Sequence, residues 1–130
     1  MQKSRTRQEL LDNTVRHFNS TNRSIKDGDR SVCAYRSSDG LACAIGREIS
    51  DELALKLDSE MLGSMCNVFD KLPLRLRNFG IFFLGDIQIL HDREDYWDKK
   101  GLNNNGREAV KEICEDYQLK NPALINNQKY

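Results

Sequence analysis

Apolar residues recur at helical spacing at the start of the chain and through most of its second half. Thr6 and Glu9 have the spacing of a capping box, and an apolar stripe follows them. Its members are Leu10, Leu11, Thr14, Val15 and Phe18. This pattern predicts a first amphipathic helix over about residues 7–18, whose stripe must pack on another part of the chain.

Further helices are predicted after residue 49, because N-capping residues precede apolar residues at helical spacing. Ser50 and Ser64 each precede a short helix, and Pro73 ends the second one. A turn that ends at Gly80 then leads into longer periodic segments. These segments predict a helix over about 82–92, with Phe83, Leu84, Ile87 and Leu90 on one face, and a last helix over about 106–117.

Residues 31–45 show a different pattern, in which two strand-like runs flank the turn residues Ser37-Ser38-Asp39-Gly40. This pattern predicts a β-hairpin with Gly40 in the left-handed bulge position. The expected register places Tyr35 opposite Cys43, and Cys33 opposite Ile45, on one large apolar face. The other face carries small residues and one cation, namely Val32, Ala34, Arg36, Ala42 and Ala44.

The predicted fold class is α+β, with this one hairpin packed on a helix-rich single domain that spans residues 1–130. A hairpin alone is marginally stable, so its large face must pack on the helices, or a partner chain must extend it. The polar stretch near 19–30 is expected to be a mobile connection, and the tail after about 121 to be flexible. No apolar run is long enough to cross a bilayer and no signal peptide is recognisable, which favours the cytoplasm.

The 130 residues include 20 Lys and Arg and 20 Asp and Glu, so the formal net charge is zero. Basic residues outnumber acidic ones in residues 1–36, and acidic residues outnumber basic ones in residues 48–98. Proteins that bind nucleic acid concentrate more positive charge on one face, which argues against that role for the whole chain. The alternative that stays open is a basic stripe near the start, made of Lys3, Arg5, Arg7, Arg16 and Arg23.

Few residues suit catalysis or metal binding. The four cysteines stand far apart without a C-x-x-C pair, which favours four reduced, buried thiols over disulfides or a zinc site. His91 and Asp92 form a His-Asp pair like that of metal-dependent phosphohydrolases, but His17 is the one other histidine available as a ligand. Nucleophile elbows and glycine-rich phosphate loops are missing from the sequence. We therefore expect no cofactor and no metal, and an enzyme is the less favoured reading.

The small-residue face of the hairpin is the main candidate site. A flat or anionic ligand, or a partner helix, could lie across its alanines while Arg36 and Arg47 donate charge-assisted hydrogen bonds. The structural alternative is that the alanines let a helix of the same chain pack closely. Trp97, expected in a loop, is either an interface anchor or a lid over the core. The candidate binding residues are Ala34, Arg36, Asp39, Ala42, Ala44, Arg47, His91 and Trp97.

The segment Cys33-Ala34-Tyr35-Arg36, with Asp39-Gly40 and Cys43-Ala44-Ile45-Gly46, resembles a hairpin found in small uncharacterised proteins of bacteriophages and prophages. The resemblance extends over about residues 31–95, through a short acidic helix and an apolar helix that ends in His91-Asp92. It implies a phage source but no activity.

These observations favour a small non-enzymatic phage protein that inhibits or sequesters a host factor during infection. The expected partner is a host defence protein or a nucleotide-like signal, bound stoichiometrically in the host cytoplasm on the hairpin face, with a homodimer as a further expectation. Two alternatives belong to other classes: a nucleic-acid accessory protein that uses the basic stripe, and a metal-dependent hydrolase that uses His91 and Asp92.

Overall fold

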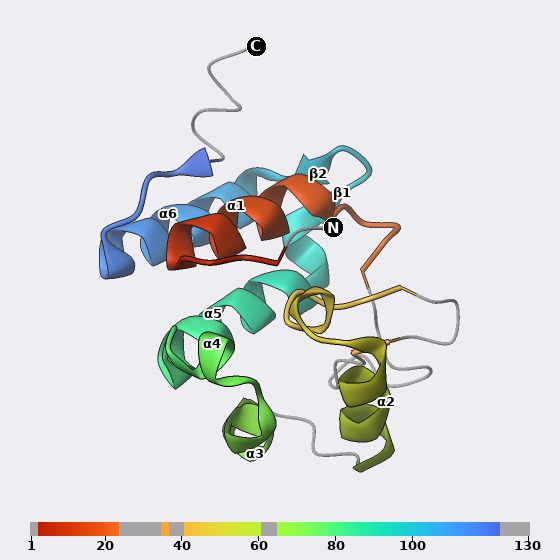
Figure 1. Ribbon diagram of the computed structural model, residues 1–130. Helices are drawn as coiled ribbons and strands as arrows, with labels where there is room; N and C mark the ends of the chain where they lie inside the picture. Colours follow the sequence, from red (N-terminus) through yellow and green to blue (C-terminus); the bar gives the residue numbers. More distant parts are fainter. Residues whose placement is uncertain (1–2, 24–34, 37–40, 61–64, 123–130) are drawn as a thin grey trace.

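A computed structural model describes residues 3–23, 35–36, 41–60 and 65–122 of the chain. The fold is helix-rich α+β, as the sequence predicts, and its described elements surround a central helix, α5 (Figure 1). The helices are α1 (Arg7–His17), α2 (Asp51–Glu60), α3 (Met65–Val68), α4 (Leu74–Arg77), α5 (Ile81–Asp92) and α6 (Asn104–Tyr117). Short 3-10 helices span Gly46–Glu48, Phe69–Lys71 and Glu94–Tyr96, and two strands, β1 (Trp97–Asp98) and β2 (Gly101–Leu102), pair antiparallel.

The N-terminus of α1 is capped as its sequence predicts. Thr6 Oγ1 accepts a 3.0 Å hydrogen bond from the Glu9 backbone N–H, and the Glu9 carboxylate accepts one of 2.8 Å from the Arg5 N–H. These contacts satisfy backbone donors that a helix leaves free at its start. The capping-box prediction is therefore confirmed.

The caps of the other helices agree with the sequence in part. Ser50 Oγ accepts a 3.1 Å hydrogen bond from the Leu53 N–H at the start of α2. Ser64, the cap expected for α3, lies outside the described residues. Helix α6 begins two residues before the expected start because the Asn103 side chain accepts a hydrogen bond from the Gly106 N–H.

The two-stranded sheet of the described residues is β1–β2, and not the hairpin expected at 31–45. Strands of two residues are too short to produce an alternating pattern, which is why the sequence did not reveal this hairpin. Residues 31–34 and 37–40, including Ala34 and Asp39, lie outside the described residues. The remaining part holds one antiparallel bridge, Arg36 to Ala42, which is the pair that the expected register requires.

The second arm of the expected hairpin ends earlier than predicted. After Cys43 the chain turns into the 3-10 helix at Gly46–Glu48. Gly46 lies so close to the Tyr35 carbonyl that a Cβ there would come within 2.5 Å of the oxygen, so the chain folds back onto the first arm. Tyr35, Cys43 and Ile45 are buried as expected, but Ala44 is also buried, with 2% of its surface exposed. The interpretation of Ala44 as part of an open binding face is therefore wrong, whereas its burial agrees with the structural alternative of close packing within the chain.

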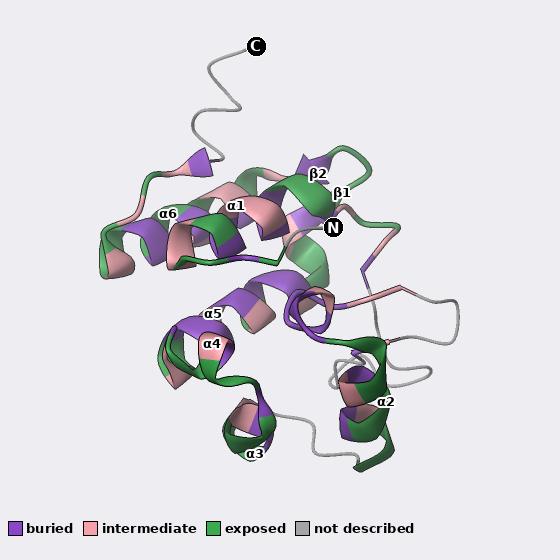
Figure 2. Cartoon of the chain, viewed as in Figure 1, coloured by how far each residue is buried: buried purple, intermediate pink, exposed green. Residues whose placement is uncertain are grey.

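The buried apolar residues form one cluster, to which α5 contributes Phe83, Leu84, Ile87 and Leu90. Helices α1, α3 and α6 each contact α5, and Figure 2 shows buried stretches along its ribbon. Cys43 and Cys114 are buried free thiols, as expected, whereas Cys66 is exposed on α3. The expectation that all four cysteines are buried is thus wrong for Cys66, and Cys33 lies outside the described residues.

A buried carboxylate that the sequence did not single out fixes the first residues of the chain. Glu48 is 2% exposed, and its carboxylate accepts hydrogen bonds from Ser4 N (2.8 Å) and Ser4 Oγ (2.9 Å). Arg75 Nη1 lies 3.1 Å from Glu48 Oε1 and also donates to the Ser4 carbonyl. The segment before α1 is therefore held against the 3-10 helix at Gly46–Glu48 and against α4.

Candidate functional site

Arg36, the cation of the expected binding face, makes its hydrogen bonds within the chain. Its guanidinium donates to Asp51 Oδ1 (2.8 Å), to the Gly46 carbonyl (2.7 Å) and to the Tyr35 carbonyl (3.0 Å). These contacts close the turn that leads to α2. Arg36 therefore stabilises this turn, and the N–H donors of its guanidinium are already engaged in hydrogen bonds within the chain.

Arg47 is also held by the protein. Its guanidinium carbon lies 5.8 Å from the centroid of the Phe18 ring, and Nη1 donates to the Asn13 carbonyl. Partial burial lowers the pKa of Arg47, an effect that Glu48 opposes. Ala42 is half-buried opposite Arg36, and Ala44 is in the core. The described residues of the predicted hairpin face thus do not form a shared open surface.

The His91 ring is completely buried and packs edge-on against Phe18, with 4.7 Å between the ring centroids. Burial lowers the pKa of His91, although its 2.8 Å hydrogen bond between Nδ1 and Asp92 Oδ1 acts in the opposite direction. Among the described residues, Nε2 has no hydrogen-bond partner. His91 is therefore a residue of the core, and its ring is closed off from solvent in the described part of the chain.

Trp97 belongs to the core as well, which agrees with the structural reading rather than with an interface anchor. It is 5% exposed, and its indole Nε1 donates a 2.9 Å hydrogen bond to the Leu90 carbonyl. Its ring lies 6.2 Å from that of Phe18 in an edge-on arrangement. Trp97 therefore joins β1 to the end of α5.

The proposed basic stripe is not a free positive surface. Lys3 Nζ donates to the backbone carbonyls of Arg47 and Ile49, and Arg7 Nε donates to the Phe79 carbonyl. Arg23 is 6% exposed, and its Nη1 donates to the His91 carbonyl. Arg5 and Arg16 remain exposed. Three of the five cations thus stabilise the fold, so the charge left for phosphate contacts is small.

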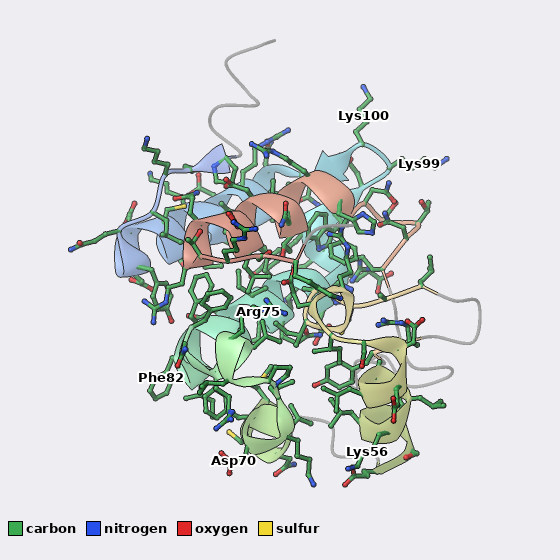
Figure 3. The ribbon with its side chains drawn as sticks, in the orientation of Figure 1. Lys56, Asp70, Arg75, Phe82, Lys99 and Lys100 are labelled. Carbon is green, nitrogen blue, oxygen red and sulfur yellow. The ribbon has the colours of Figure 1, made fainter. Side chains whose placement is uncertain are left out.

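The surface that does stand out is one side of α5. Phe82 is 81% exposed and Ile89 is 55% exposed, and their spacing of seven positions places both side chains on the same side of the helix. Figure 3 shows Phe82 at the edge of the molecule, pointing away from α5. Gly85 and Asp86 lie between them along this side. We call these four residues, Phe82, Gly85, Asp86 and Ile89, the α5 face.

A groove between α5 and α6 adjoins the α5 face. Its volume is about 130 Å³, well below the several hundred cubic ångströms typical of small-molecule sites. Three carboxylates line it, those of Asp86 on α5 and of Glu112 and Asp116 on α6. The ion pairs among the described residues involve none of the three. The remaining lining residues are Ile89, Leu90, Tyr96, Ala109 and Ile113.

A hydrogen bond beside the groove connects its two helices. The Tyr117 hydroxyl donates to Asp86 Oδ2 over 2.7 Å. Burial and this hydrogen bond raise the pKa of Tyr117 to about 12. This hydrogen bond therefore holds the Asp86 side chain in place at the junction of the α5 face and the groove.

The sequence contained a signal for the α5 face. The helix expected over 82–92 buries Phe83, Leu84, Ile87 and Leu90, so its period leaves Phe82 and Ile89 on the other side. The acidic groove had no such signal, because Glu112 and Asp116 have the spacing of an ordinary solvated helix surface. Only the packing of α6 on α5 brings them beside Asp86.

Comparisons of the chain with family models, with curated proteins and with solved structures found no match. Within the described ranges, no three His, Cys, Asp or Glu side chains come together as a metal site. The helices of those same ranges include none that combines the length and the apolarity needed to cross a membrane.

Proposed function

We propose that this protein is a binding protein that acts by occupying a protein partner, and that the α5 face is its docking surface. The observation that carries the proposal is the exposure of Phe82 and Ile89 on one side of the central helix. Burying a large apolar side chain stabilises a complex by about 1.5–3 kcal/mol. Two such side chains on one side of a rigid helix are typical of an interface anchor.

The rigidity of α5 supports this role. Its opposite side is fixed in the core by Phe83, Leu84, Ile87 and Leu90, each at most 1% exposed. This packing opposes a rotation of α5 about its axis, so Phe82 and Ile89 stay exposed on its outer side. A preorganised surface loses less conformational freedom on binding, which favours affinity.

A protein partner fits the site better than a nucleotide does. Recognition of a phosphate needs free guanidinium or backbone donors, but Arg36 and Arg47 are engaged within the chain. The groove beside α5 is lined by carboxylates, which repel phosphates. Within the proposal, the partner is a host protein bound during infection, because the resemblance of residues 31–95 implies a phage source.

The experiment compares capture of proteins from a bacterial lysate by the wild-type chain and by two surface variants. Phe82→Ser removes the main anchor of the α5 face, and Leu55→Ser is the matched control, since Leu55 is 70% exposed on α2. A protein captured by wild type and by Leu55→Ser, but not by Phe82→Ser, is then purified and titrated by calorimetry. We expect saturation at a fixed stoichiometry, and affinity lost in Phe82→Ser. Capture that is the same for both variants would remove the α5 face as the docking surface.

A further inference from the structure

Packing within the chain gives no reason for a glycine at position 85 of the α5 face. It lies in the middle of α5, where glycine is about 1 kcal/mol less favourable than alanine. A Cβ built at Gly85 would meet no atom within 4 Å. The space that the missing side chain leaves is therefore outside the molecule, between the Phe82 and Ile89 side chains.

The glycine of α6 shows the contrast. A Cβ at Gly106 would collide with the Tyr96 carbonyl oxygen and come within 2.6 Å of the Leu102 side chain. Gly106 is thus required by packing within the chain, as glycines in helices commonly are. Gly85 has no such requirement, and its absent side chain permits a close approach from outside.

The shape of the α5 face suits a helix. Phe82 and Ile89 are seven residues apart, which is about 10 Å along the helix axis, with the glycine between them. A crossing helix approaches most closely where the side chain at the crossing point is smallest. A partner helix can therefore cross α5 at Gly85 and place apolar side chains between Phe82 and Ile89.

The carboxylates beside the α5 face indicate which charge the partner helix should carry. Asp86, Glu112 and Asp116 border the crossing point on the side of the groove, and none of the three takes part in an ion pair among the described residues. A partner with lysine or arginine beside its apolar residues would meet these carboxylates, whereas an acidic partner would be repelled. A second copy of this chain is also disfavoured, since a symmetric contact at Gly85 would place the two Asp86 carboxylates near one another.

Resting on the proposed function, we infer that the α5 face binds a basic amphipathic helix of a protein partner, which crosses α5 at Gly85. The probes are two synthetic helical peptides with the same leucine positions, one with lysine and one with glutamate at every polar position. Their binding to the full chain is measured by fluorescence anisotropy at low and at moderate salt. We expect the lysine peptide to bind at least about tenfold more tightly than the glutamate peptide, and this ratio to shrink as salt increases.

Three variants test where and how the lysine peptide binds. Gly85→Gln adds a polar side chain at the crossing point and should weaken binding about tenfold or more, while circular dichroism shows the helix content retained. The double variant Glu112→Gln/Asp116→Asn should weaken binding about three- to tenfold. Glu108→Gln/Glu115→Gln removes the same charge from exposed positions of α6 outside the groove, so it should have less effect.

The outcomes separate this inference from the proposed function. Equal binding of both peptides, blocked by Gly85→Gln, would overturn the basic partner but leave the α5 face as a docking surface. Binding of the lysine peptide that is unchanged in Gly85→Gln would be unspecific attraction and would overturn the crossing at Gly85. Failure of both peptides to bind would overturn the inference, while the capture experiment with Phe82→Ser would still decide the proposed function. A concentration-dependent dimer that Gly85→Gln dissociates would show that a second copy is the occupant instead.

Discussion

The Tyr117 hydroxyl donates a 2.7 Å hydrogen bond to Oδ2 of Asp86 and so joins α6 to α5 beside the acidic groove. The guanidinium carbon of Arg7 lies 5.2 Å from the centroid of the Tyr117 ring and 5.2 Å from that of Phe83. The residue that presents its carboxylate at the α5 face is thus linked through Tyr117 to α1 as well. Changes at this hydrogen bond should be visible both in the titration of Tyr117 and in the binding of a basic partner.

Replacing Asp86 by asparagine should lower the pKa of Tyr117 from about 12 towards its ordinary value near 10, because the neighbouring negative charge opposes ionisation of the phenol. The measurement is the ultraviolet absorbance of tyrosinate as pH rises. Tyr117→Phe identifies the signal, since it removes the Tyr117 phenol. An unchanged titration in Asp86→Asn would show that burial alone shifts this pKa.

The pKa of Tyr117, raised by burial and by this hydrogen bond, makes stability depend on pH in the alkaline range. Since the folded protein holds the proton of Tyr117 more tightly than the unfolded chain, the unfolded chain loses it first as pH rises above about 10. The free energy of unfolding should therefore fall between about pH 10 and pH 12, and fall less steeply in Tyr117→Phe. Chemical denaturation of the wild type and of Tyr117→Phe at several pH values measures this fall. An equal fall in the free energy of unfolding of both proteins would contradict the prediction.

Alanine substitutions at the two helical glycines should act in opposite directions. Gly85→Ala should raise the free energy of unfolding by about 1 kcal/mol, because alanine is the better helix former and a Cβ meets open space. Gly106→Ala should lower it, because the Cβ collides with the Tyr96 carbonyl oxygen. Urea denaturation of both variants measures these two changes in the free energy of unfolding. Destabilisation by Gly85→Ala would show that something within the chain needs the glycine.

The ion pair between the buried Glu48 carboxylate and the partly exposed Arg75 guanidinium should be important for stability. Arg75→Ala leaves the buried Glu48 carboxylate with the two Ser4 donors as its remaining hydrogen-bond partners among the described contacts, and should cost about 3 kcal/mol. Arg93→Ala is the control, since it breaks the ion pair with Asp95 on the surface and should change stability little. Thermal unfolding of both variants measures the difference. A loss of stability in Arg93→Ala as large as that in Arg75→Ala would contradict the prediction that the pair at the buried Glu48 contributes more than a surface pair.

His91 should make the protein less stable in mild acid. Burial lowers its pKa below the ordinary value near 6.5, so the unfolded chain binds a proton there at a higher pH than the folded protein does. The free energy of unfolding should therefore fall as pH drops below about 6.5, and His91→Gln should remove part of this fall. Denaturation curves at neutral and mildly acidic pH provide the test, with His17→Gln as the comparison at a less buried histidine.

Much of the fold could be predicted because its signals are local. Thr6 with Glu9, and Ser50 before Leu53, set helix starts by hydrogen bonds between near neighbours. The register of the expected hairpin is confirmed at the described pair Arg36 and Ala42 for a similar reason, since it follows from the turn between them. The two-residue strands β1 and β2 gave no comparable signal, and they form because packing holds Trp97 against the end of α5.

The candidate site was much harder to predict. Arg36, Arg47 and His91 are residue types that often bind ligands, but which donors remain free depends on partners elsewhere in the chain. Gly46 and Asn13 supply the carbonyls that engage the two arginines, and Phe18 covers the imidazole. The predicted binding face therefore could not be evaluated from residue type and spacing alone.

By itself the sequence determined where most helices begin and end and which side of each is apolar, because caps and periodicity act over a few residues. It thereby also left Phe82 and Ile89 on the outer side of α5. Only the tertiary structure decided that α6 brings Glu112 and Asp116 beside Asp86, and that Glu48 is buried against Arg75. The physical reason is that charge and burial depend on neighbours distant in sequence, which helical periodicity does not specify.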